Sequence, residues 1–298
     1  GDVSVTGTLT GNASAISMKS IDIASGGTYT ATSGTTTITG VGGSDYPFKN
    51  HTSGNFVHSS GTVTFSSSAY KNFDAGGDPF YNFISTGTSE FRSQRAFTVA
   101  NDFTISSSGS GYFRPNGNAF TVTGDVAINS GGEIRCTDEA DTFGSLTIAS
   151  GGTYSATSGT TTIKGNASSS SNLAWKNNGT FTHNSGTVLF DGTNTFGGSS
   201  YGHIQPVTNT FNNLTINADS KYIQFRGSSQ TVTVAGDLTV TDGALMNYGT
   251  NTATITVTGD VSIADGATLG ANTGGNDMVA PMNFGSLTIA DGGTFIAT

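Results

Sequence analysis

Four acidic residues lie close together near the middle of the chain: Glu133, Asp138, Glu139 and Asp141. A pair of carboxylates can act as acid and base across a glycosidic bond, provided that the fold brings both groups to one face of the protein. Arg135 lies among these acids and offers a charged partner for one of them. Whether this group can do chemistry therefore depends on the elements that position it.

Histidine is a common metal ligand, and the chain contains four: His51, His58, His183 and His203. His58 and His183, however, occupy equivalent places in two copies of one motif, 125 residues apart, which is too far along a repeat to share an ion. Each stands beside a Ser-Gly turn. We therefore interpret them as hydrogen-bonded corner residues, and we predict no metal site.

Two glycine-rich turns, Val41–Asp45 and Gly76–Asp78, are weakly similar to calcium-binding turns. The nonapeptide repeat that builds such calcium sites is missing from the chain. Calcium is the one cofactor that the sequence leaves open, and no other cofactor is predicted.

Aromatic residues and glycine are concentrated in two regions, namely Val41–Asn50 with Tyr70–Phe83, and Asn194–Phe211. Because these regions interrupt the regular spacing of the chain and contain three of its five prolines, we expect loops that bulge from the scaffold. Exposed rings on such loops could stack on sugars. The candidate binding residues are Tyr46, Phe48, Tyr70, Phe80, Tyr81, Phe196 and Tyr201.

The composition favours a folded chain built of strands. Only 10% of the 298 residues are charged and 43 are glycine, which is typical neither of helical nor of ordinary globular proteins. Phenylalanine and regularly spaced Val, Ile and Leu supply the apolar surface that disordered segments lack. The net charge is −9 with scattered basic residues, so we expect no binding to nucleic acid.

No apolar run approaches the roughly 18 residues of a membrane span, so no membrane insertion is expected. The single cysteine, Cys136, cannot form an internal disulfide. We interpret it as a small, partly buried hydrophobic residue, with an intermolecular disulfide or a reactive thiol as the less favoured alternative.

One short element occurs three times, at Ser20–Thr39, at Phe143–Lys164 and, incompletely, at Phe284–Thr298. Its alternating runs and its Gly-Gly and Ser-Gly turns predict short strands and leave no room for a helix. The copies define a long repeat of roughly 125–141 residues, covering about 20–163 and 143–298, with the last copy incomplete. A unit this small must stack on neighbours like itself to bury its apolar side chains.

Predicted strand centres recur every 20 to 26 residues within the long repeat. Coils that stack in the same direction form parallel sheets, so the predicted fold is all-β: a single right-handed parallel β-helix (β-solenoid) with loop insertions, continuous over residues 1–298. The handedness follows from the general preference of parallel crossovers. About thirteen coils at roughly 4.8 Å per coil give a rod about 60 Å long.

Glycine and aspartate recur at the predicted corners, where we expect glycine to supply positive φ and aspartate to make turn hydrogen bonds. These pairs are Gly124-Asp125, Gly236-Asp237 and Gly259-Asp260 before strands, and Gly131-Gly132, Asp242-Gly243, Asp265-Gly266 and Asp291-Gly292 after them. Between corners, Val, Ile, Leu and Phe should point inward and Thr outward. The core should consist of aliphatic ladders, with aromatic rungs at Phe56, Phe65, Phe181 and Phe190.

On such a solenoid, two acids can meet on one face when they lie one coil apart. One coil before the acidic group lies Asn116–Asn118, and one coil after it lies Ser158–Thr160; neither contains an acid. We therefore predict a solvated loop in which Arg135 pairs with an acid, no catalytic residues and no enzyme activity.

Three runs, Phe181–Gly192, Phe211–Ile216 and Val232–Val240, are similar to those of the repetitive β-helix surface proteins and adhesins of bacteria. The likeness extends over essentially the whole chain. It implies a secreted protein with a structural or adhesive role, and it carries no catalytic residues to this sequence.

We therefore expect a structural segment of a fibre, stalk or adhesin in an extracellular or cell-surface location. Neither end carries a recognisable cap, so we expect end-to-end self-assembly or continuation in a longer array of the same repeat. The main alternative is a carbohydrate- or surface-binding module whose aromatic loops contact surface glycans. Ice binding by rows of outward Thr is less favoured, and polysaccharide cleavage least.

Overall fold

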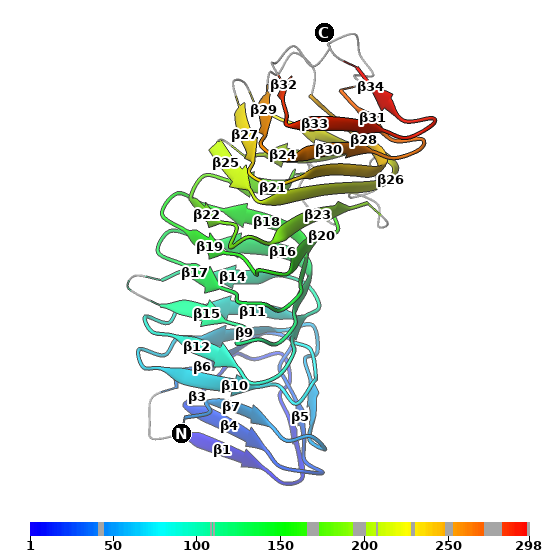
Figure 1. Ribbon diagram of the computed structural model, residues 1–298. Coiled ribbons are helices and arrows are strands. Elements are labelled where there is room, and N and C mark those ends of the chain that lie inside the picture. Colours follow the sequence, from blue (N-terminus) through cyan, green and yellow to red (C-terminus); the bar gives the residue numbers. More distant parts are fainter. Residues whose placement is uncertain are drawn as a thin grey trace.

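The computed structural model describes residues 1–40, 45–107, 109, 111–165, 173–192, 201–206, 208–227, 230–247, 253–270 and 282–296. In these ranges the secondary structure consists of strands and turns, with no helix. Figure 1 shows the strands stacked in chain order along one long axis, from β1 (Asp2–Val5) at one end to β33 (Ser286–Ile289) and β34 (Thr294–Phe295) at the other. The pairing between coils is parallel, as in the register of β1 with β4 (Ser20–Ile23). The predicted all-β, parallel β-solenoid is confirmed.

The first face of the solenoid is a nine-stranded sheet. Its strands, in spatial order, are β1, β4, β7 (Phe48–Asn50), β10 (Lys71–Asp74), β12 (Phe91–Ser93), β15 (Tyr112–Arg114), β17 (Glu133–Arg135), β19 (Thr153–Ser155) and β22 (Thr180–Thr182).

Two shorter sheets lie at the two ends of the rod. One contains β2 (Thr8–Thr10), β5 (Thr28–Thr30) and β8 (Asn55–Val57), and the other β25 (Thr208–Phe211), β27 (Gln230–Val234), β29 (Ala253–Val257) and β32 (Met282–Asn283).

The largest set of paired strands covers two neighbouring faces, because some of its strands turn the corner between them. β16 (Phe120–Ile128), for example, pairs with β13 (Phe97–Val99) through its first half and with β14 (Phe103–Ile105) through its second. The other members are β3 (Ile16–Met18), β6 (Thr35–Ile38), β9 (Thr62–Phe65), β11 (Asn82–Ser85), β18 (Asp141–Ile148), β20 (Thr160–Ile163), β21 (Leu173–Asn177), β23 (Thr187–Asp191), β24 (Tyr201–Gln205), β26 (Asn213–Phe225), β28 (Leu238–Asn247), β30 (Asp260–Ile263), β31 (Thr268–Leu269), β33 and β34.

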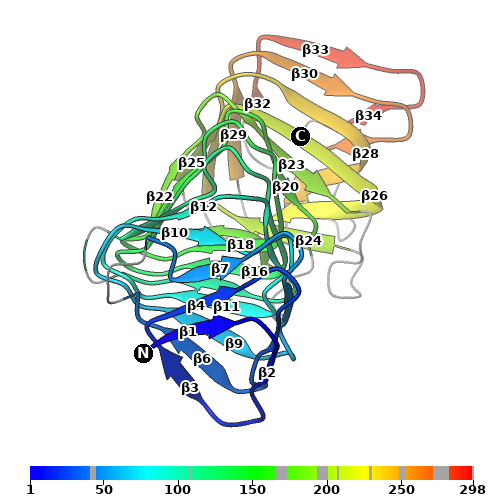
Figure 2. The same ribbon diagram turned by 90° about the horizontal axis from the view of Figure 1, so that it is seen from below.

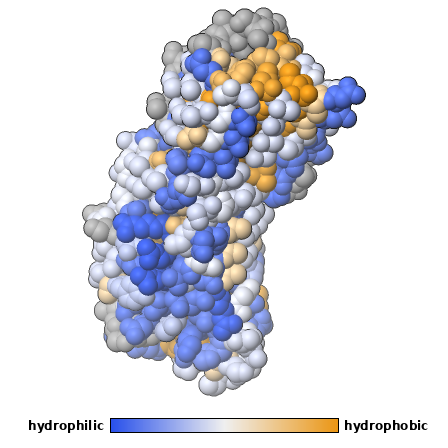
Figure 3. All heavy atoms as spheres, viewed as in Figure 1, coloured by the Kyte–Doolittle hydropathy of each residue, from blue (hydrophilic) through white to orange (hydrophobic). Residues whose placement is uncertain are grey.

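The rod is not straight. Seen from below, the coils from β26 to β33 are displaced to one side of the earlier ones (Figure 2). On the face shown in Figure 3, the first half of the rod is mostly hydrophilic, whereas apolar surface gathers near the last coils. Ile289 and Ile296 are among the exposed large apolar residues of the described chain.

The expected alternation is confirmed on most strands. In β6 and in β20, two threonines are half-exposed and the isoleucine is buried, but the middle threonine, Thr36 or Thr161, is also buried instead of pointing outward. The core differs from the expected aliphatic ladders, because between β7 and β18 it is mainly a stack of phenylalanine rings. The buried rings of this stack are Phe48, Phe56, Phe65, Phe73, Phe80, Phe83, Phe91, Phe97, Phe103, Phe113, Phe120 and Phe143. Of the four expected rungs, Phe56, Phe65 and Phe190 are buried and Phe181 is partly buried.

The stack corrects the prediction of bulging aromatic loops. Within Val41–Asn50 and Tyr70–Phe83 the chain forms β7, β10 and part of β11, and Phe48 stacks on Phe73 with their ring centroids 5.8 Å apart. Large rings next to proline and glycine are typical of loops, but here they face the core and continue the stack. Residues 41–44 and 193–200 lie outside the described part of the chain.

Glycines at the corners have two different roles. Gly131 and Gly266, which follow strands, have positive φ as predicted, 75° and 72°, and Gly243, which lies within β28, also has a φ of 72°. In the Gly-Asp pairs, by contrast, the glycines Gly124, Gly236 and Gly259 do not have positive φ. At Gly124 the requirement is space, because an added Cβ would lie 2.5 Å from Oδ1 of Asp102 on the previous coil.

Aspartates at the Gly-Asp corners link one coil to the next, as expected of turn residues. The backbone N–H of Asp125 donates to Oδ1 of Asp102 at 2.9 Å, and the Ser145 hydroxyl donates to Oδ1 of Asp125 at 2.6 Å. Asp260 donates in the same way to Asp237 at 2.9 Å. The number of coils, about thirteen, and the right-handed sense stay predictions.

The phenylalanine stack yields a stability prediction. Phe83 is fully buried, and its ring lies 5.1–5.8 Å, between centroids, from five other phenylalanines. Phe83→Ala should lower the free energy of unfolding by about 3–5 kcal/mol, because it leaves a cavity that the neighbouring coils cannot close. Chemical denaturation followed by circular dichroism measures the change.

Ile84→Thr on the same strand is the matched control for Phe83→Ala. Ile84 points outward between Thr64 and Thr104 of the adjacent coils, so threonine there should change stability by no more than about 0.5 kcal/mol. Equal losses of unfolding free energy in Phe83→Ala and Ile84→Thr would contradict a special contribution of the phenylalanine stack to stability.

Candidate functional site

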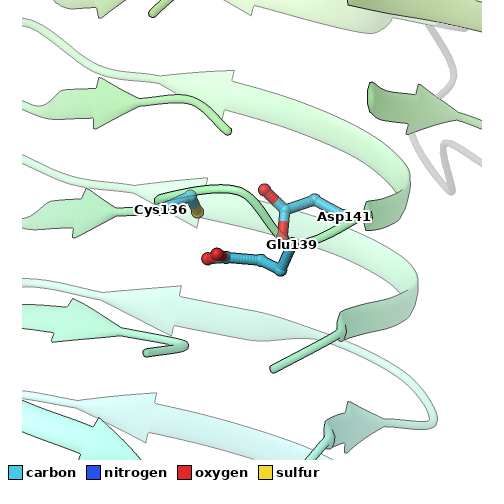
Figure 4. A group of neighbouring side chains, drawn as sticks. All are labelled: Cys136, Glu139 and Asp141. Atoms are coloured by element: carbon cyan, nitrogen blue, oxygen red, sulfur yellow. The ribbon is translucent and has the colours of Figure 1, made fainter. Parts of the chain in front are cut away.

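A thiol and two carboxyl groups meet inside the solenoid, at the connection between β17 and β18. Figure 4 shows Cys136, Glu139 and Asp141 converging from this one connection. One donor atom of each, Sγ of Cys136 and a carboxylate oxygen of the other two, lies within 4.8 Å of the others. The side chains are 5%, 6% and 0% exposed, in that order. We call these three residues the thiol–carboxylate cluster.

The predicted solvated loop is therefore wrong for Glu139 and Asp141. Strand alternation places Ile134 and Cys136 on the inside, and the chain stays close to the core until Asp141 enters β18. Burial of Cys136 agrees with the prediction of a small buried residue. Only the exposed Asp138 behaves as the solvated acid that the sequence suggested.

Glu139 is held by the backbone of its own loop. Its Oε2 accepts hydrogen bonds from the N–H groups of Thr137 and Asp138, both at 3.0 Å, and from the Thr137 hydroxyl at 2.7 Å. The Thr157 hydroxyl of the next coil donates to the carbonyl oxygen of Glu139. Oε1 of Glu139 is buried and has no hydrogen-bond partner in the described structure.

Asp141 occupies an inward place in a ladder of side chains, between Phe120 on the previous coil and Thr161 on the next. Its Oδ2 accepts a hydrogen bond from the Tyr154 hydroxyl at 3.0 Å, and that hydroxyl also lies 2.9 Å from Oγ1 of Thr161. Oδ1 of Asp141 is buried without a hydrogen-bond partner in the described structure, and the Cys136 thiol, a weak donor, lies beside it.

Burial also controls protonation in the cluster. Desolvation raises the pKa of Asp141 from 3.8 to about 7, although the neighbouring Cys136 thiol and the hydrogen bond from Tyr154 act in the opposite direction. Desolvation, reinforced by the two neighbouring carboxyl groups, raises the pKa of the Cys136 thiol well above its ordinary value. The thiol is thus not activated as a nucleophile in the metal-free protein.

The equivalent coil of the previous repeat lacks this cluster. Residues 125 positions earlier are Gly11, Ser14 and Ile16. The surroundings are nevertheless alike, because Tyr29 and Thr36 pair through their hydroxyls at 3.2 Å just as Tyr154 and Thr161 do. The fold therefore does not require a thiol or a carboxylate at these places. In the sequence, the cluster can be recognised from the difference between these residues in the two copies of the repeat.

Glu133, the first of the four acidic residues near the middle of the chain, lies outside the thiol–carboxylate cluster. Its carboxylate accepts two hydrogen bonds from Arg135, at 2.6 and 2.8 Å, as the sequence suggested. The Arg135 guanidinium also lies over the ring of Tyr112, 3.8 Å from its centroid. This pair is part of the surface.

The repeated histidines are corner residues, as predicted. The N–H of Ser60 donates to Nδ1 of His58 at 3.0 Å, and the N–H of Ser185 donates to Nδ1 of His183 at 3.0 Å. His51 pairs with Asp22 at 2.9 Å on the surface. Among the described residues, no group of three metal-ligand side chains includes a histidine.

The aromatic binding candidates are only partly at the surface. Phe48 and Phe80 are fully buried in the phenylalanine stack, so they cannot contact a sugar and that part of the prediction is wrong. Tyr70 is 42% exposed, and Tyr46 and Tyr81 are half-buried. Phe196 and the side chain of Tyr201 lie outside the described residues.

Side chains of the protein already lie against the three remaining tyrosine rings. Lys49 lies over Tyr46, with its Nζ 5.6 Å from the ring centroid, and the Arg92 guanidinium lies over Tyr70 at 5.1 Å. The rings of Tyr81 and His58 are 5.3 Å apart.

The raised pKa of Asp141 gives a pH dependence of stability in the metal-free protein. Cys136, Glu139 and Tyr154 face the Asp141 carboxyl, which holds a proton in the folded state between pH 3.8 and about 7, whereas the unfolded state has lost it. The contribution of Asp141 to stability is therefore complete below pH 3.8 and declines up to about pH 7, by at most about 1.4 kcal/mol per pH unit. Asp141→Asn should remove this slope.

Urea denaturation in the presence of a chelator, repeated across this pH range, measures the difference between wild type and Asp141→Asn. The exposed Asp138 of the same loop provides the control, since Asp138→Asn should keep the wild-type slope. Parallel profiles for wild type and Asp141→Asn would show that the Asp141 carboxyl is not the responsible group.

Comparisons with protein-family models, with curated proteins and with solved structures find no match to this chain. The described residues contain no helix that is long and apolar enough to cross a membrane.

Proposed function

We propose that this chain is a structural, non-enzymatic segment of an extracellular or cell-surface fibre, stalk or adhesin. The observation that carries the proposal is the continuous parallel pairing of strands from β1 to β34, with one inward side chain stacked on the next along the rod. Such stacking resists local opening, because each coil is held by hydrogen bonds and by buried side chains on both neighbours. A rod of this kind can hold a distal part away from a surface.

The distribution of acids supports the non-enzymatic part of the proposal. Glu139 and Asp141, whose carboxyl groups lie close together, are buried under their own loop. A polysaccharide cannot reach them without opening the coil. A glycosidase-type site needs its acids in an accessible cleft on either side of the scissile bond.

The first and last described coils support assembly with further coils. β1, β2 and β3 each pair with a strand on one side only, and the same holds for β32, β33 and β34. Leu9, on β2, is 38% exposed and lines a hollow together with Val3, Ile16 and Tyr29. Unpaired strand edges beside apolar side chains are a template for another chain, and we propose that a coil of the same kind covers them.

A carbohydrate- or surface-binding role ranks second. It depends on Tyr70, the most exposed of the candidate rings whose side chains the structure describes, and on the half-buried Tyr46 and Tyr81. A lysine, an arginine and a histidine lie against these three rings, which leaves less aromatic surface for a sugar to stack on. The structural role needs no such surface.

Self-assembly through the coil ends can be tested with one charged substitution. The wild-type chain should form linear oligomers whose size grows with concentration, and Leu9→Lys should shift them to monomers, because a charge would be buried against the next coil. Val57→Lys is the control, since Val57 is 40% exposed but lies on β8 within the rod. It should assemble like the wild type.

Sedimentation velocity over a range of concentrations, together with negative-stain electron microscopy, distinguishes the three proteins. A wild-type chain that stays monomeric at every concentration would contradict self-assembly. Compact rather than linear oligomers, or equal effects of Leu9→Lys and Val57→Lys, would contradict the end-to-end contact.

A further inference from the structure

We propose that the thiol–carboxylate cluster binds a divalent metal ion of the zinc class, with Cys136, Glu139 and Asp141 as its three protein ligands. The proposal is independent of the structural role, because it concerns the interior of a single coil. It rests on the convergence of three donor atoms and on two buried carboxylate oxygens that have no partner.

The geometry suits a small ion. The three donor atoms lie within 4.8 Å of one another. In a tetrahedral zinc site, with bonds of about 2.3 Å to sulfur and about 2.0–2.2 Å to oxygen, ligand atoms lie roughly 3.3–3.6 Å apart. Side-chain rotations on one short loop can close this difference. Three protein ligands leave the fourth position to a water molecule, which is a normal coordination for zinc.

The unpartnered oxygens point to a ligand rather than to a closed hydrogen-bond network. Oε1 of Glu139 and Oδ1 of Asp141 are buried without a hydrogen-bond partner in the described structure, whereas the other oxygen accepts three hydrogen bonds in Glu139 and one in Asp141. A buried carboxylate oxygen without a partner is costly. An ion at the centre of the cluster would contact both of these oxygens and the sulfur at once.

The hydrogen bonds that surround the cluster resemble the supports of a metal site. Thr137 and Asp138 fix the Glu139 carboxylate, and Tyr154 fixes that of Asp141. Such outer partners orient metal ligands and are worth roughly 10–100-fold in metal affinity. One carboxylate oxygen of each acid lies within 4.8 Å of the thiol sulfur.

The donor set selects the class of ion. Thiolate is a soft ligand that favours Zn²⁺, Co²⁺ and Cd²⁺ over Ca²⁺ and Mg²⁺, which prefer six or more oxygen ligands. The calcium that the sequence left open is therefore not the ion for this cluster. Because ligands must lose their protons on binding, metal binding and folding are coupled, and loading should occur while the coil forms.

The previous repeat provides a variant that should keep the fold without the ligands. The triple substitution Cys136→Gly, Glu139→Ser and Asp141→Ile installs the residues found at positions 11, 14 and 16, where the surrounding tyrosine and threonine are retained. A triple variant that folds but does not bind zinc separates ligation from structure. Glu133→Gln is the matched control, because Glu133 lies on the same coil outside the cluster and pairs with Arg135.

The experiment uses the full 298-residue chain, unfolded under reducing conditions with a chelator and refolded with Zn²⁺ or Co²⁺. After removal of free metal, we expect one zinc per chain in the wild type and in Glu133→Gln. The cobalt form should show a thiolate-to-cobalt absorption band in the near ultraviolet, which Cys136→Ser abolishes. Cys136→Ser and the triple variant should bind zinc about 100-fold more weakly or not at all.

Three results would overturn the proposal. The first is a correctly refolded wild type that retains no zinc, and the second is a cobalt form without the thiolate band. The third is equal zinc retention by the wild type and the triple variant, because the metal would then be bound elsewhere, for example by surface histidines.

Discussion

Parallel hydrogen bonding between successive coils is the constraint on which the whole structure depends. It fixes the separation of neighbouring strands at about 4.8 Å and places each inward side chain directly on its counterpart one coil away. Phe83 thus lies on Val63 and under Phe103, and Phe97 lies under Phe120. Flat rings and branched aliphatic side chains tolerate this spacing well, because they make close contacts with both neighbours at once.

The same constraint limits which polar residues can enter the core. Asn177 lies on Ile148. Its side-chain oxygen accepts a hydrogen bond from the N–H of Gly179 at 2.9 Å, and its side-chain NH₂ donates to Oδ1 of Asn209 at 2.5 Å. Asn50 similarly donates to the carbonyl oxygen of Ala75 and to Asp78. Such amides stabilise corners where the backbone turns. The thiol–carboxylate cluster differs from them because ionisable groups, rather than neutral amides, meet away from solvent.

Much of the fold follows from sequence patterns that depend on neighbouring residues only. Alternation within β6 and β20, and glycines such as Gly131 and Gly266 that follow strands, predict strands and turns without knowledge of the rest of the chain. The aromatic regions were misjudged because proline and glycine beside Phe48 and Phe80 are typical of loops. Inward placement of those rings depends on the register between coils, which a single local pattern does not contain.

The candidate site was missed for a related reason. The sequence argument considers acids that meet from neighbouring coils. Cys136, Glu139 and Asp141 instead belong to a single connection, and strands fix both of its ends. Local polarity of this segment suggests a solvated loop. Only the alignment of Asp141 with Ile16, one long repeat earlier, shows that the position faces the core. Repeat comparison is therefore more informative here than composition.

The place of the cluster in the rod determines what a bound ion would do there. Stability in a solenoid is approximately the sum of the coils and of the contacts between neighbours, so a local crosslink acts on the coils beside it. Cys136 follows β17 on one face, and Asp141 begins β18 on the next. An ion that joins them would fasten the corner between two faces in the middle of the chain. Opening of the rod at this coil would then require loss of the metal as well as separation of the strands.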